Sequence, residues 1–284
     1  MKLHFILVRR VPPVPSPVLL EVFEILERRG FQVESGIPEE AVVRPDRLRV
    51  AHDLYILKSH TELALSFSGV LETLGARLLN PYASCITTQD KIVASRRLRA
   101  AGVPIPRCWI TGDLTLMAPI AEHTPLIVKP HRGHRGAGIS IVRGRSELAA
   151  LQLPDGPVLI QEHVTGGGED LKVYVVGEDV FAVRKQFSPT SFTRAGRSCA
   201  VSPELREIAL ACGRTLGLGL YGLDVLETDE GPIVVDVNYF PGYKGVSGVA
   251  PLIADYIEDY AHSRQELELP PLDARPRLPA PVGT

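Results

Sequence analysis

The sequence predicts an α/β and α+β fold, with a small parallel α/β lobe first and two lobes with antiparallel sheets after it. Strands and helices alternate over roughly the first 80 residues. A glycine-rich loop then joins two strands, and a run of further strands follows. Alternating strands and helices indicate a parallel sheet, whereas consecutive strands joined by short turns indicate antiparallel pairing.

The first lobe is expected to span residues 1–82. Apolar periodicity predicts strands over 3–8, 31–34, 54–57 and 76–79, and helices over 19–29 and 63–74. Gly30 and Gly75 follow these two helices, as expected at helix ends. A third helix is expected over 88–101, and Gly102, Pro104 and Pro106 prevent it from continuing.

The central lobe is expected over 83–165 and the C-terminal lobe over 166–265. Predicted strands of the two lobes cover 125–130, 139–142, 158–164, 170–177 and 180–185 and the segments around Asp224 and Asp236. Predicted helices cover 203–216, capped by Ser202, and 249–263. Residues 266–284 are rich in proline with little apolar periodicity, which predicts a disordered tail.

Composition narrows the functional classes. The 284 residues are 45% hydrophobic and carry a net charge of −2 at a pI near 6.5, so no basic field favours nucleic acid or an anionic membrane. The four cysteines show neither a C-x-x-C pair nor zinc-finger spacing, and no segment approaches eighteen apolar residues. These features predict a cytoplasmic protein that binds neither nucleic acid nor membrane.

Three oxygen donors late in the chain suggest a metal site. Asp224 lies in one apolar run, and Asp236 and Asn238 alternate onto the same face of the next predicted strand. Two carboxylates and an amide suit Mg²⁺, which prefers oxygen ligands and often retains nucleotide phosphate oxygens in its shell. The alternative is a pair of strands whose acidic ends face solvent.

The glycine-rich loop from Gly133 to Gly138 leads from strand to strand. A P-loop or a dinucleotide-binding loop opens a helix, so neither assignment suits this context. Such a loop can hold phosphate with its backbone N–H groups, although an ordinary hairpin turn is the alternative. Lys129 precedes the loop in an apolar run, where an unpaired charge is costly, and this favours a functional role over a solvated lysine. For Lys91, a surface role remains the alternative.

Taken in order, these segments resemble the ATP-grasp superfamily from the N-terminus to about residue 263. They are Lys91, Lys129, the glycine loop, Gln161-Glu162, Asp170 with Lys172, and Asp224, Asp236 and Asn238. The resemblance implies that ATP lies between the second and third lobes and that Mg²⁺, or Mn²⁺ as an alternative, binds the three oxygen donors. The residues that it implies for ATP are Lys91, Lys129, Gly133, Gly136, Gly138, Gln161, Glu162, Val164 and Asp170.

Two branches of the superfamily fit different segments. Asn80-Pro-Tyr through Asp90-Lys91, the glycine loop and Gly167-Gly-Glu-Asp170-Leu-Lys172 look like the ribosomal-protein glutamate ligases and related amino-acid ligases. Leu57-Lys58-Ser-His60 and Asp236-Val-Asn-Tyr-Phe-Pro-Gly look like the inositol polyphosphate kinases. We expect a ligase that joins a small carboxylate to an amine through an acyl phosphate. The alternatives are an inositol-phosphate-type kinase and a non-catalytic ATP-binding regulator.

The acceptor, a small molecule, is the least determined part, and the oligomeric state is left open. Lys172, Arg184, Lys185 and Arg194 are the expected catalytic residues. The expected substrate contacts are Arg9, Lys58, His60, Arg197, Gly242 and Lys244. Arginine suits a carboxylate, an acyl phosphate or a phosphorylated sugar equally well. For Arg194 and Arg197 the alternative is a solvated loop, and for His60 an ordinary surface histidine.

Overall fold

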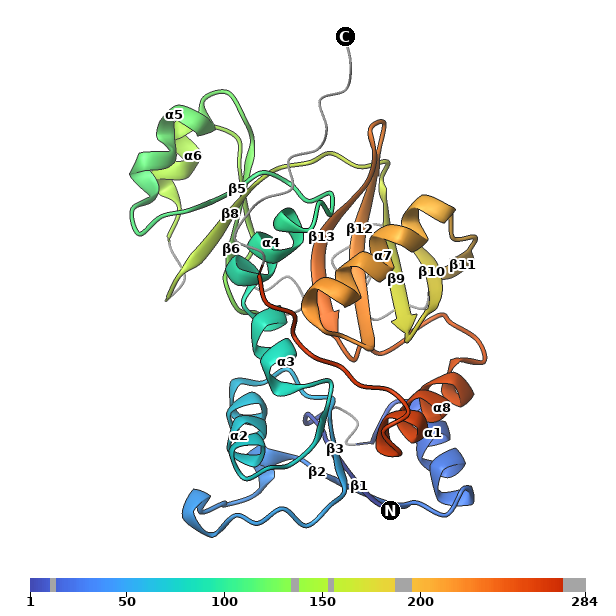
Figure 1. The fold of residues 1–284 in the computed structure, drawn as a ribbon. Coiled ribbons are helices and arrows are strands. Elements are labelled where there is room, and N and C mark those ends of the chain that lie inside the picture. Colours follow the sequence, from blue (N-terminus) through green and yellow to red (C-terminus); the bar gives the residue numbers. More distant parts are fainter. Residues whose placement is uncertain (11–13, 134–137, 153–155, 187–195, 273–284) are drawn as a thin grey trace.

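The computed structural model describes residues 1–10, 14–133, 138–152, 156–186 and 196–272, and Figure 1 shows their arrangement. Three sheets, which we name A, B and C, follow one another along the chain. Sheet A is parallel, and sheets B and C are antiparallel. The predicted fold class is confirmed. The sheets lie within the three expected segments, whose exact boundaries stay a prediction.

Sheet A has the strand order β2-β1-β3-β4. Its strands are β1 (Lys2–Ile6), β2 (Gln32–Gly36), β3 (Leu54–Leu57) and β4 (Leu78–Leu79), linked by helices α1 (Pro17–Arg28) and α2 (Glu62–Thr73) and by the short turns η1 (Pro38–Glu40) and η2 (Pro45–Arg47). Leu3 and Phe5 pack toward α1, while Ile6 and Tyr55 pack toward α2. The carboxyl end of β3 leads into Lys58 and His60, and the carboxyl edge of a parallel sheet is a common place for ligands.

Sheet B has the order β5-β8-β6-β7. Its elements are β5 (Cys108–Ile110), η3 (Leu114–Met117), α5 (Ala118–Ala121), β6 (Leu126–Pro130), β7 (Ser140–Val142), α6 (Arg145–Ala150) and β8 (Val158–Glu162). Val128 and Ile160 pack with Met117 and Leu148 on the face that α5 and α6 cover. Since side chains alternate along a strand, Lys129 and Gln161 lie on the other face.

Sheet C has the order β11-β10-β9-β12-β13. Its strands are β9 (Glu169–Val176), β10 (Asp179–Gln186), β11 (Arg197–Cys199), β12 (Leu220–Thr228) and β13 (Gly231–Tyr239), followed by α8 (Val249–Ala261), with α7 (Pro203–Leu216) before β12. The α7 helix covers one face of sheet C through Leu171, Val173 and Leu223. Ser202 caps this helix by accepting a hydrogen bond from the Leu205 N–H at 3.1 Å, as its sequence predicts.

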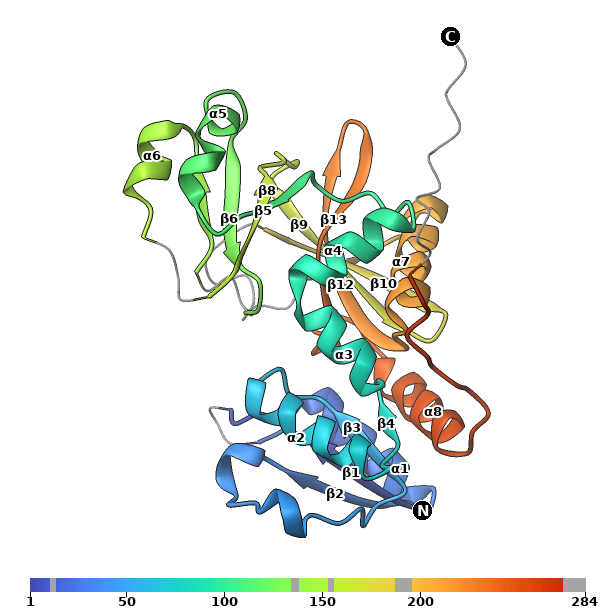
Figure 2. The same ribbon diagram turned by 60° about the vertical axis from the view of Figure 1, so that its left-hand side comes forward.

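The expected helix over 88–101 corresponds to α4 (Lys91–Ala100), and its first two residues belong to a separate helix, α3 (Tyr82–Gln89), that was not expected. Asp90 separates them and caps α4, because its carboxylate accepts hydrogen bonds from the N–H groups of Ile92 (3.1 Å) and Val93 (3.2 Å). The two helices lead from sheet A to sheets B and C (Figure 2). The break places Lys91 at the first position of α4.

Asn80 joins the first lobe to the third. Its buried side-chain oxygen accepts hydrogen bonds from the N–H groups of Gly219 (2.8 Å) and Leu220 (3.1 Å), and its NH₂ group donates to the Leu220 carbonyl at 2.8 Å. The C-terminal helix adds a second connection, because α8 packs beside α1 (Figure 1). Arg29 forms ion pairs there with Asp255 at 2.6 Å and Glu258 at 2.9 Å.

Residues 266–272 differ from the expected disordered tail. Leu267 packs against the core around α8, and the Pro270 carbonyl accepts a hydrogen bond from Arg97 of α4 at 2.8 Å. A proline-rich segment without periodicity can still pack when its carbonyls find donors on neighbouring helices. The rest of the expected tail, 273–284, lies outside the described residues. Among the helices that are described, none has the length and apolar character needed to cross a membrane.

Candidate active site

Neighbouring strands of sheet C bring together a row of charged side chains. Lys172 of β9 is paired with Asp224 of β12, which is paired with Asp236 of β13, so the three lie side by side on one face. The Lys172 Nζ lies 2.7 Å from Asp224 Oδ1. Asn238 is two residues beyond Asp236 and lies on the same face, opposite Gly222.

Lys91 reaches this row from the start of α4. Its Nζ lies 2.8 Å from Asp236 Oδ1 and 3.1 Å from Oδ2, and the lysine side chain is only 12% exposed. Burial by itself would raise the pKa of the Asp236 carboxyl, but Lys91 and Lys129 outweigh this effect and hold the pKa below its ordinary value. Asp236 is therefore an ionised oxygen donor at neutral pH.

Lys129 reaches the same place from sheet B. It is 6% exposed, and its Nζ donates a hydrogen bond to the Val235 carbonyl on β13 at 3.0 Å. Burial lowers the pKa of Lys129, although the nearby Asp236 carboxylate opposes this. Two lysines from two separate elements thus lie close enough to one carboxylate to lower its pKa.

The same face of sheet C continues toward β10. Lys185 is paired with Asp170, and both lie on the face that carries Lys172. Burial lowers the pKa of Lys172, but Asp224 outweighs this and the net pKa is raised. Burial raises the pKa of Asp170, and burial with the adjacent Lys172 and Lys244 lowers the pKa of Lys185. The charged groups at this end of the row thus lie close enough to shift one another's pKa values.

The hinge between sheets B and C follows β8. Gln161 is buried, and its amide nitrogen lies 3.5 Å from the Cys108 sulfur. The Glu162 carboxylate accepts two hydrogen bonds from Arg107, each 2.8 Å long, and this guanidinium lowers its pKa. The Glu162 backbone N–H also donates a hydrogen bond to the Arg107 carbonyl at 2.9 Å. Val164, two residues on, is half-buried.

A cavity of about 330 Å³ opens beside Lys91 and Asn238, between sheet A and the other lobes. His60 and Tyr239 stack in its wall, with ring centroids 4.2 Å apart at an angle of 25°. Arg132, just before the glycine loop, lies 3.1 Å from Glu62 at the start of α2. The other lining residues are Thr61, Thr88, Gln89, Gly133 and Val237. A smaller cavity of about 20 Å³ lies among Lys91, Lys129, Gln161 and Asp236.

Two of the expected arginines lie on the other face of sheet C. Arg184 is paired with Leu171, which packs against α7, and its guanidinium forms ion pairs with Glu227. Arg197 is paired with Arg184 and shares its face. The strand register gives the reason, because adjacent Arg184 and Lys185 must point to opposite sides. The structure therefore brings Lys185 toward Lys172 and leaves Arg184 and Arg197 away from it.

The remaining predicted site residues are spread more widely. Arg9 pairs with Glu40 at 2.9 Å on the surface of the first lobe. Lys58 lies over the Phe240 ring at 5.2 Å, near His60, and Lys244 is close enough to Lys185 to affect its pKa. Gly242 is exposed, and Gly138 has a positive φ of 74° against Pro130. Gly136 and Arg194 lie outside the described residues.

Sequence reasoning missed several side chains of the larger cavity. Glu62, Gln89 and Tyr239 come from three separate elements, so their meeting depends on how α2, α3 and β13 pack. Tyr239 donates to the Ser59 carbonyl at 2.9 Å and lies 2.9 Å from the Gln89 side-chain oxygen. Arg132 carried a usable signal, because it stands three residues after Lys129 and immediately before Gly133.

Comparison with known proteins identifies the class. Residues 88–256 match the family model described as the RimK-like ATP-grasp domain, which covers more than half of the chain. The chain therefore belongs to the RimK-like ATP-grasp family, and the resemblance inferred from its sequence is confirmed.

Particular relatives narrow the comparison. The chain is 28% identical over 216 residues to a probable alpha-L-glutamate ligase of Shewanella amazonensis, covering 68% of this chain and 71% of that one. Its fold is similar to a RimK domain ATP-grasp protein of Sphaerobacter thermophilus, with TM-score 0.74, 21% identity, and 91% and 100% of the two chains covered. It is also similar to D-alanine--D-alanine ligase of Bacillus anthracis complexed with ATP, with TM-score 0.70, 18% identity, and 93% and 98% covered.

Proposed function

We propose that this protein is an ATP-dependent ligase that couples a small carboxylate to an amine. The observation that carries the proposal is the convergence of Lys91, Lys129 and Lys172 on the two carboxylates Asp224 and Asp236. Three lysines from a helix and two different sheets suit a triphosphate, because phosphoryl transfer depends mainly on positioning and charge neutralisation.

For ATP, we assign the phosphates to Lys91, Lys129 and Lys172, with Gly133 and Gly138 at the ends of the loop nearby. The adenine would lie at the hinge of Gln161, Glu162 and Val164. Glu162 has both its carboxylate and its N–H engaged by Arg107, so its contribution there would come from its carbonyl. Asp170 would lie beyond the phosphates, on the face shared with Lys172 and Lys185.

For the metal, the donor set fits Mg²⁺. Asp224 and Asp236 face one another across β12 and β13, and the amide oxygen of Asn238 lies on the same face. Hard oxygen donors of this kind suit Mg²⁺, with Mn²⁺ as an alternative ion. A bound ion would supply charge neutralisation at the phosphates. In this structure the Lys91 ammonium forms an ion pair with Asp236. We expect this ammonium to move to a phosphate oxygen when nucleotide binds.

For the carboxylate substrate, we assign the cavity of about 330 Å³ beside Asn238. Arg132 can pair with a carboxylate, His60 and Tyr239 offer a flat aromatic wall, and Glu62 and Gln89 can bind an ammonium group. A cavity with both kinds of partner suits an amino acid. The name of the glutamate ligase relative supports an amino-acid-like substrate as well.

The proposed reaction has two steps. A carboxylate oxygen of the substrate attacks the γ-phosphorus of ATP, and ADP leaves with the electron pair of the broken P–O bond. The amine nitrogen then attacks the acyl carbon, loses a proton and displaces phosphate. We assign Lys172 and Lys185 to hold the transferred phosphoryl group, because they border Asp224 and Asp170 on one face. We propose that the reaction takes place in the cytoplasm, where ATP is supplied and the four free cysteines stay reduced.

The test is a hydroxylamine trap with a panel of amino acids, in the presence of Mg²⁺ and ATP. A ligase of this type forms ADP and a hydroxamate, because hydroxylamine captures the acyl phosphate. ADP formation with phosphate retained on a polyol, and no hydroxamate, would instead establish the kinase. Nucleotide binding without ADP formation on any substrate would favour a regulator. The ligase names of the relatives support the first outcome.

A further inference from the structure

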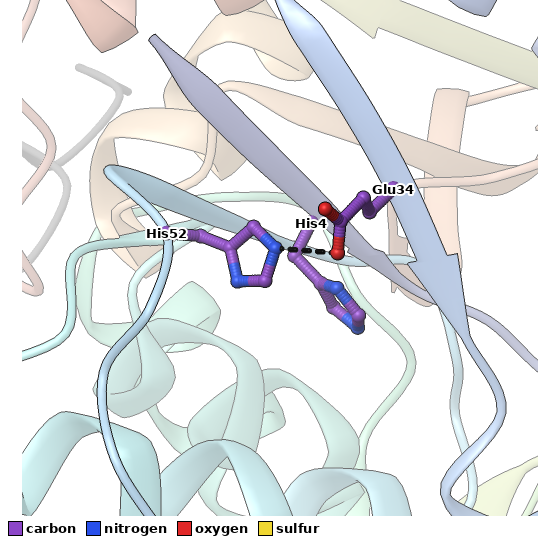
Figure 3. Close-up of side chains that lie close together, drawn as sticks. All are labelled: His4, Glu34 and His52. Carbon is purple, nitrogen blue, oxygen red and sulfur yellow. Dashed lines mark hydrogen bonds and ion pairs between the residues drawn. The ribbon is translucent and has the colours of Figure 1, made fainter.

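His4, Glu34 and His52 form a cluster on sheet A, apart from the catalytic cleft. One ligand atom of each lies within 4.8 Å of the other two. Figure 3 shows the three side chains pointing toward one another from β1, β2 and the segment before β3. None of them lines the cavity assigned to the substrate or the smaller one beside Lys129.

The strand register builds this cluster. His4 and Glu34 are paired directly across β1 and β2, so their side chains share a face of the sheet. His4 is also paired with Tyr55 on β3. His52, three residues before Tyr55, packs its ring against the rings of both His4 and Tyr55, with centroids 4.8 Å and 5.3 Å away. Gly36 leaves room for the His4 ring, because a Cβ there would lie 3.1 Å from its Nε2.

The hydrogen bonds of the cluster are incomplete. The His52 Nε2 lies 2.9 Å from Glu34 Oε2, and its Nδ1 lies 3.3 Å from the Tyr55 hydroxyl. The Tyr55 hydroxyl also accepts a hydrogen bond from the Ala51 N–H at 3.1 Å. The His4 Nδ1, in contrast, is buried and has no hydrogen-bond partner among the described residues. A buried polar atom without a partner is costly, which calls for a ligand that this nitrogen could bind.

We propose that His4, Glu34 and His52 bind a divalent transition-metal ion, with Zn²⁺ as the best match. Two imidazoles and one carboxylate form an established type of three-residue zinc set that leaves a fourth position for water. The nitrogen donors favour such an ion over the Mg²⁺ expected at the oxygen donors of sheet C. Tyr55 would orient His52 as a ligand. When the His52 Nε2 binds the ion, the proton lies on Nδ1, and this Nδ1–H can donate a hydrogen bond to the Tyr55 hydroxyl.

The cluster has to contract to hold an ion. Ligand atoms about 2 Å from a tetrahedral zinc lie roughly 3.3 Å apart. The His52 Nε2 and Glu34 Oε2 are already 2.9 Å apart, whereas separations within the set reach up to 4.8 Å, so the distances to His4 have to shorten. Glu34 can supply the movement, because its side chain is 60% exposed, whereas that of His52 is only 11% exposed and held by Tyr55. The competing interpretation is a hydrogen-bonded cluster on the surface that never binds metal, and the experiment separates the two.

The experiment titrates Co²⁺ into tag-free, chelator-treated protein without nucleotide and follows its visible absorption. Zn²⁺ should then displace the Co²⁺ at one equivalent. His52→Asn and Glu34→Gln should each weaken binding by at least about tenfold. His123→Asn, which changes an exposed histidine elsewhere, should bind as the wild type does. Zn²⁺ at roughly 100 times its Kd should raise Tm by about 5 °C in the wild type and not in Glu34→Gln.

Asp236→Asn distinguishes the two metal sites. If Co²⁺ binds at the cluster, this change in the catalytic cleft leaves the titration unaltered. Three results would overturn the proposal: no absorption bands in the wild type, wild-type affinity in either cluster variant that folds, or loss of binding in Asp236→Asn. Glu34 is largely exposed, so Glu34→Gln decides the question even if His52→Asn fails to fold.

Discussion

At the scale of single residues, Asp236 is the carboxylate that two lysines from different elements approach. It accepts hydrogen bonds from Lys91 and lies near Lys129, so it is an ionised carboxylate surrounded by cations. In the proposed enzyme it exchanges these partners for a metal ion and loses none of its charge. Its role depends on the negative charge rather than on its shape.

Asp236→Asn keeps the shape and removes the charge. We expect turnover in the hydroxamate assay to fall by at least about 100-fold, because charge stabilisation in the transition state is lost. The circular dichroism spectrum should stay unchanged. Asp229→Asn, in the exposed turn between β12 and β13, is the matched control and should retain activity. Wild-type turnover in Asp236→Asn would remove this residue from the metal site.

The same carboxylate predicts a pH dependence of stability. Its pKa is lower in the folded protein than the ordinary value of 3.8, so the unfolded chain takes up this proton first as the pH falls. The stabilisation is therefore complete above that ordinary pKa and is lost as the pH falls through the folded-state pKa. Denaturant titrations should show the gap in unfolding free energy between wild type and Asp236→Asn narrowing below about pH 4. A constant gap down to pH 2.5 would contradict the shift.

At the scale of elements, the junction between α3 and α4 decides where Lys91 lies. The residues from Thr88 to Ala101 have the composition of one continuous helix. The apolar pattern does not indicate a break between two helices at Asp90. In the structure its carboxylate caps α4 and turns the chain, so that the next residue is directed at Asp236. A helix cap and a contact within the candidate site thus depend on adjacent residues.

Asp90→Ala should affect stability and nucleotide affinity together. Loss of the cap is expected to lower the free energy of unfolding by about 1 kcal/mol. Because Lys91 then loses its fixed position, KM for ATP should rise as well. Asp113→Ala is the matched control, since Asp113 caps η3 at a distance from the cleft. Asp113→Ala should lower stability without changing KM for ATP. An equal KM in both variants would contradict a dependence of the Lys91 position on the Asp90 cap.

The elements also show what a sequence can and cannot predict here. Periodicity and glycine positions located most strands and helices, because these are local properties. The face on which Arg184 lies depends on its pairing with Leu171, which alternation along one strand does not reveal. The sequence pointed to Lys172, Asp224 and Asp236 one by one. That they form a row depends on the register of three strands, which only the structure shows. The His4 cluster joins residues up to 48 positions apart and has no local signal.

At the scale of the whole molecule, buried polar contacts hold the lobes together. Asn80 satisfies two N–H groups and one carbonyl at the start of β12, and the Tyr260 hydroxyl donates to the Leu78 carbonyl at 3.0 Å. The first lobe is therefore fixed to sheet C, which carries the proposed metal ligands. Sheet B has its own separate core.

Asn80→Ala should destabilise the whole protein. Three hydrogen bonds of about 1 kcal/mol each are lost, so the free energy of unfolding should fall by about 3 kcal/mol. Chemical denaturation measures this, with Gln152→Ala at an exposed amide as the control. A loss no larger than that of the control would mean that the lobes are held by other contacts.

The packing of α8 against α1 has a consequence for synthesis on the ribosome. Leu3, Phe5 and Val22 pack in one core with Ile253 and Ile257. The hydrophobic core of the first lobe is therefore completed by side chains of α8. Until α8 has been synthesised, the growing chain carries an exposed apolar surface that α8 covers in the folded protein. We therefore expect the core of the first lobe to be completed only after α8 has left the ribosome and folded back onto α1.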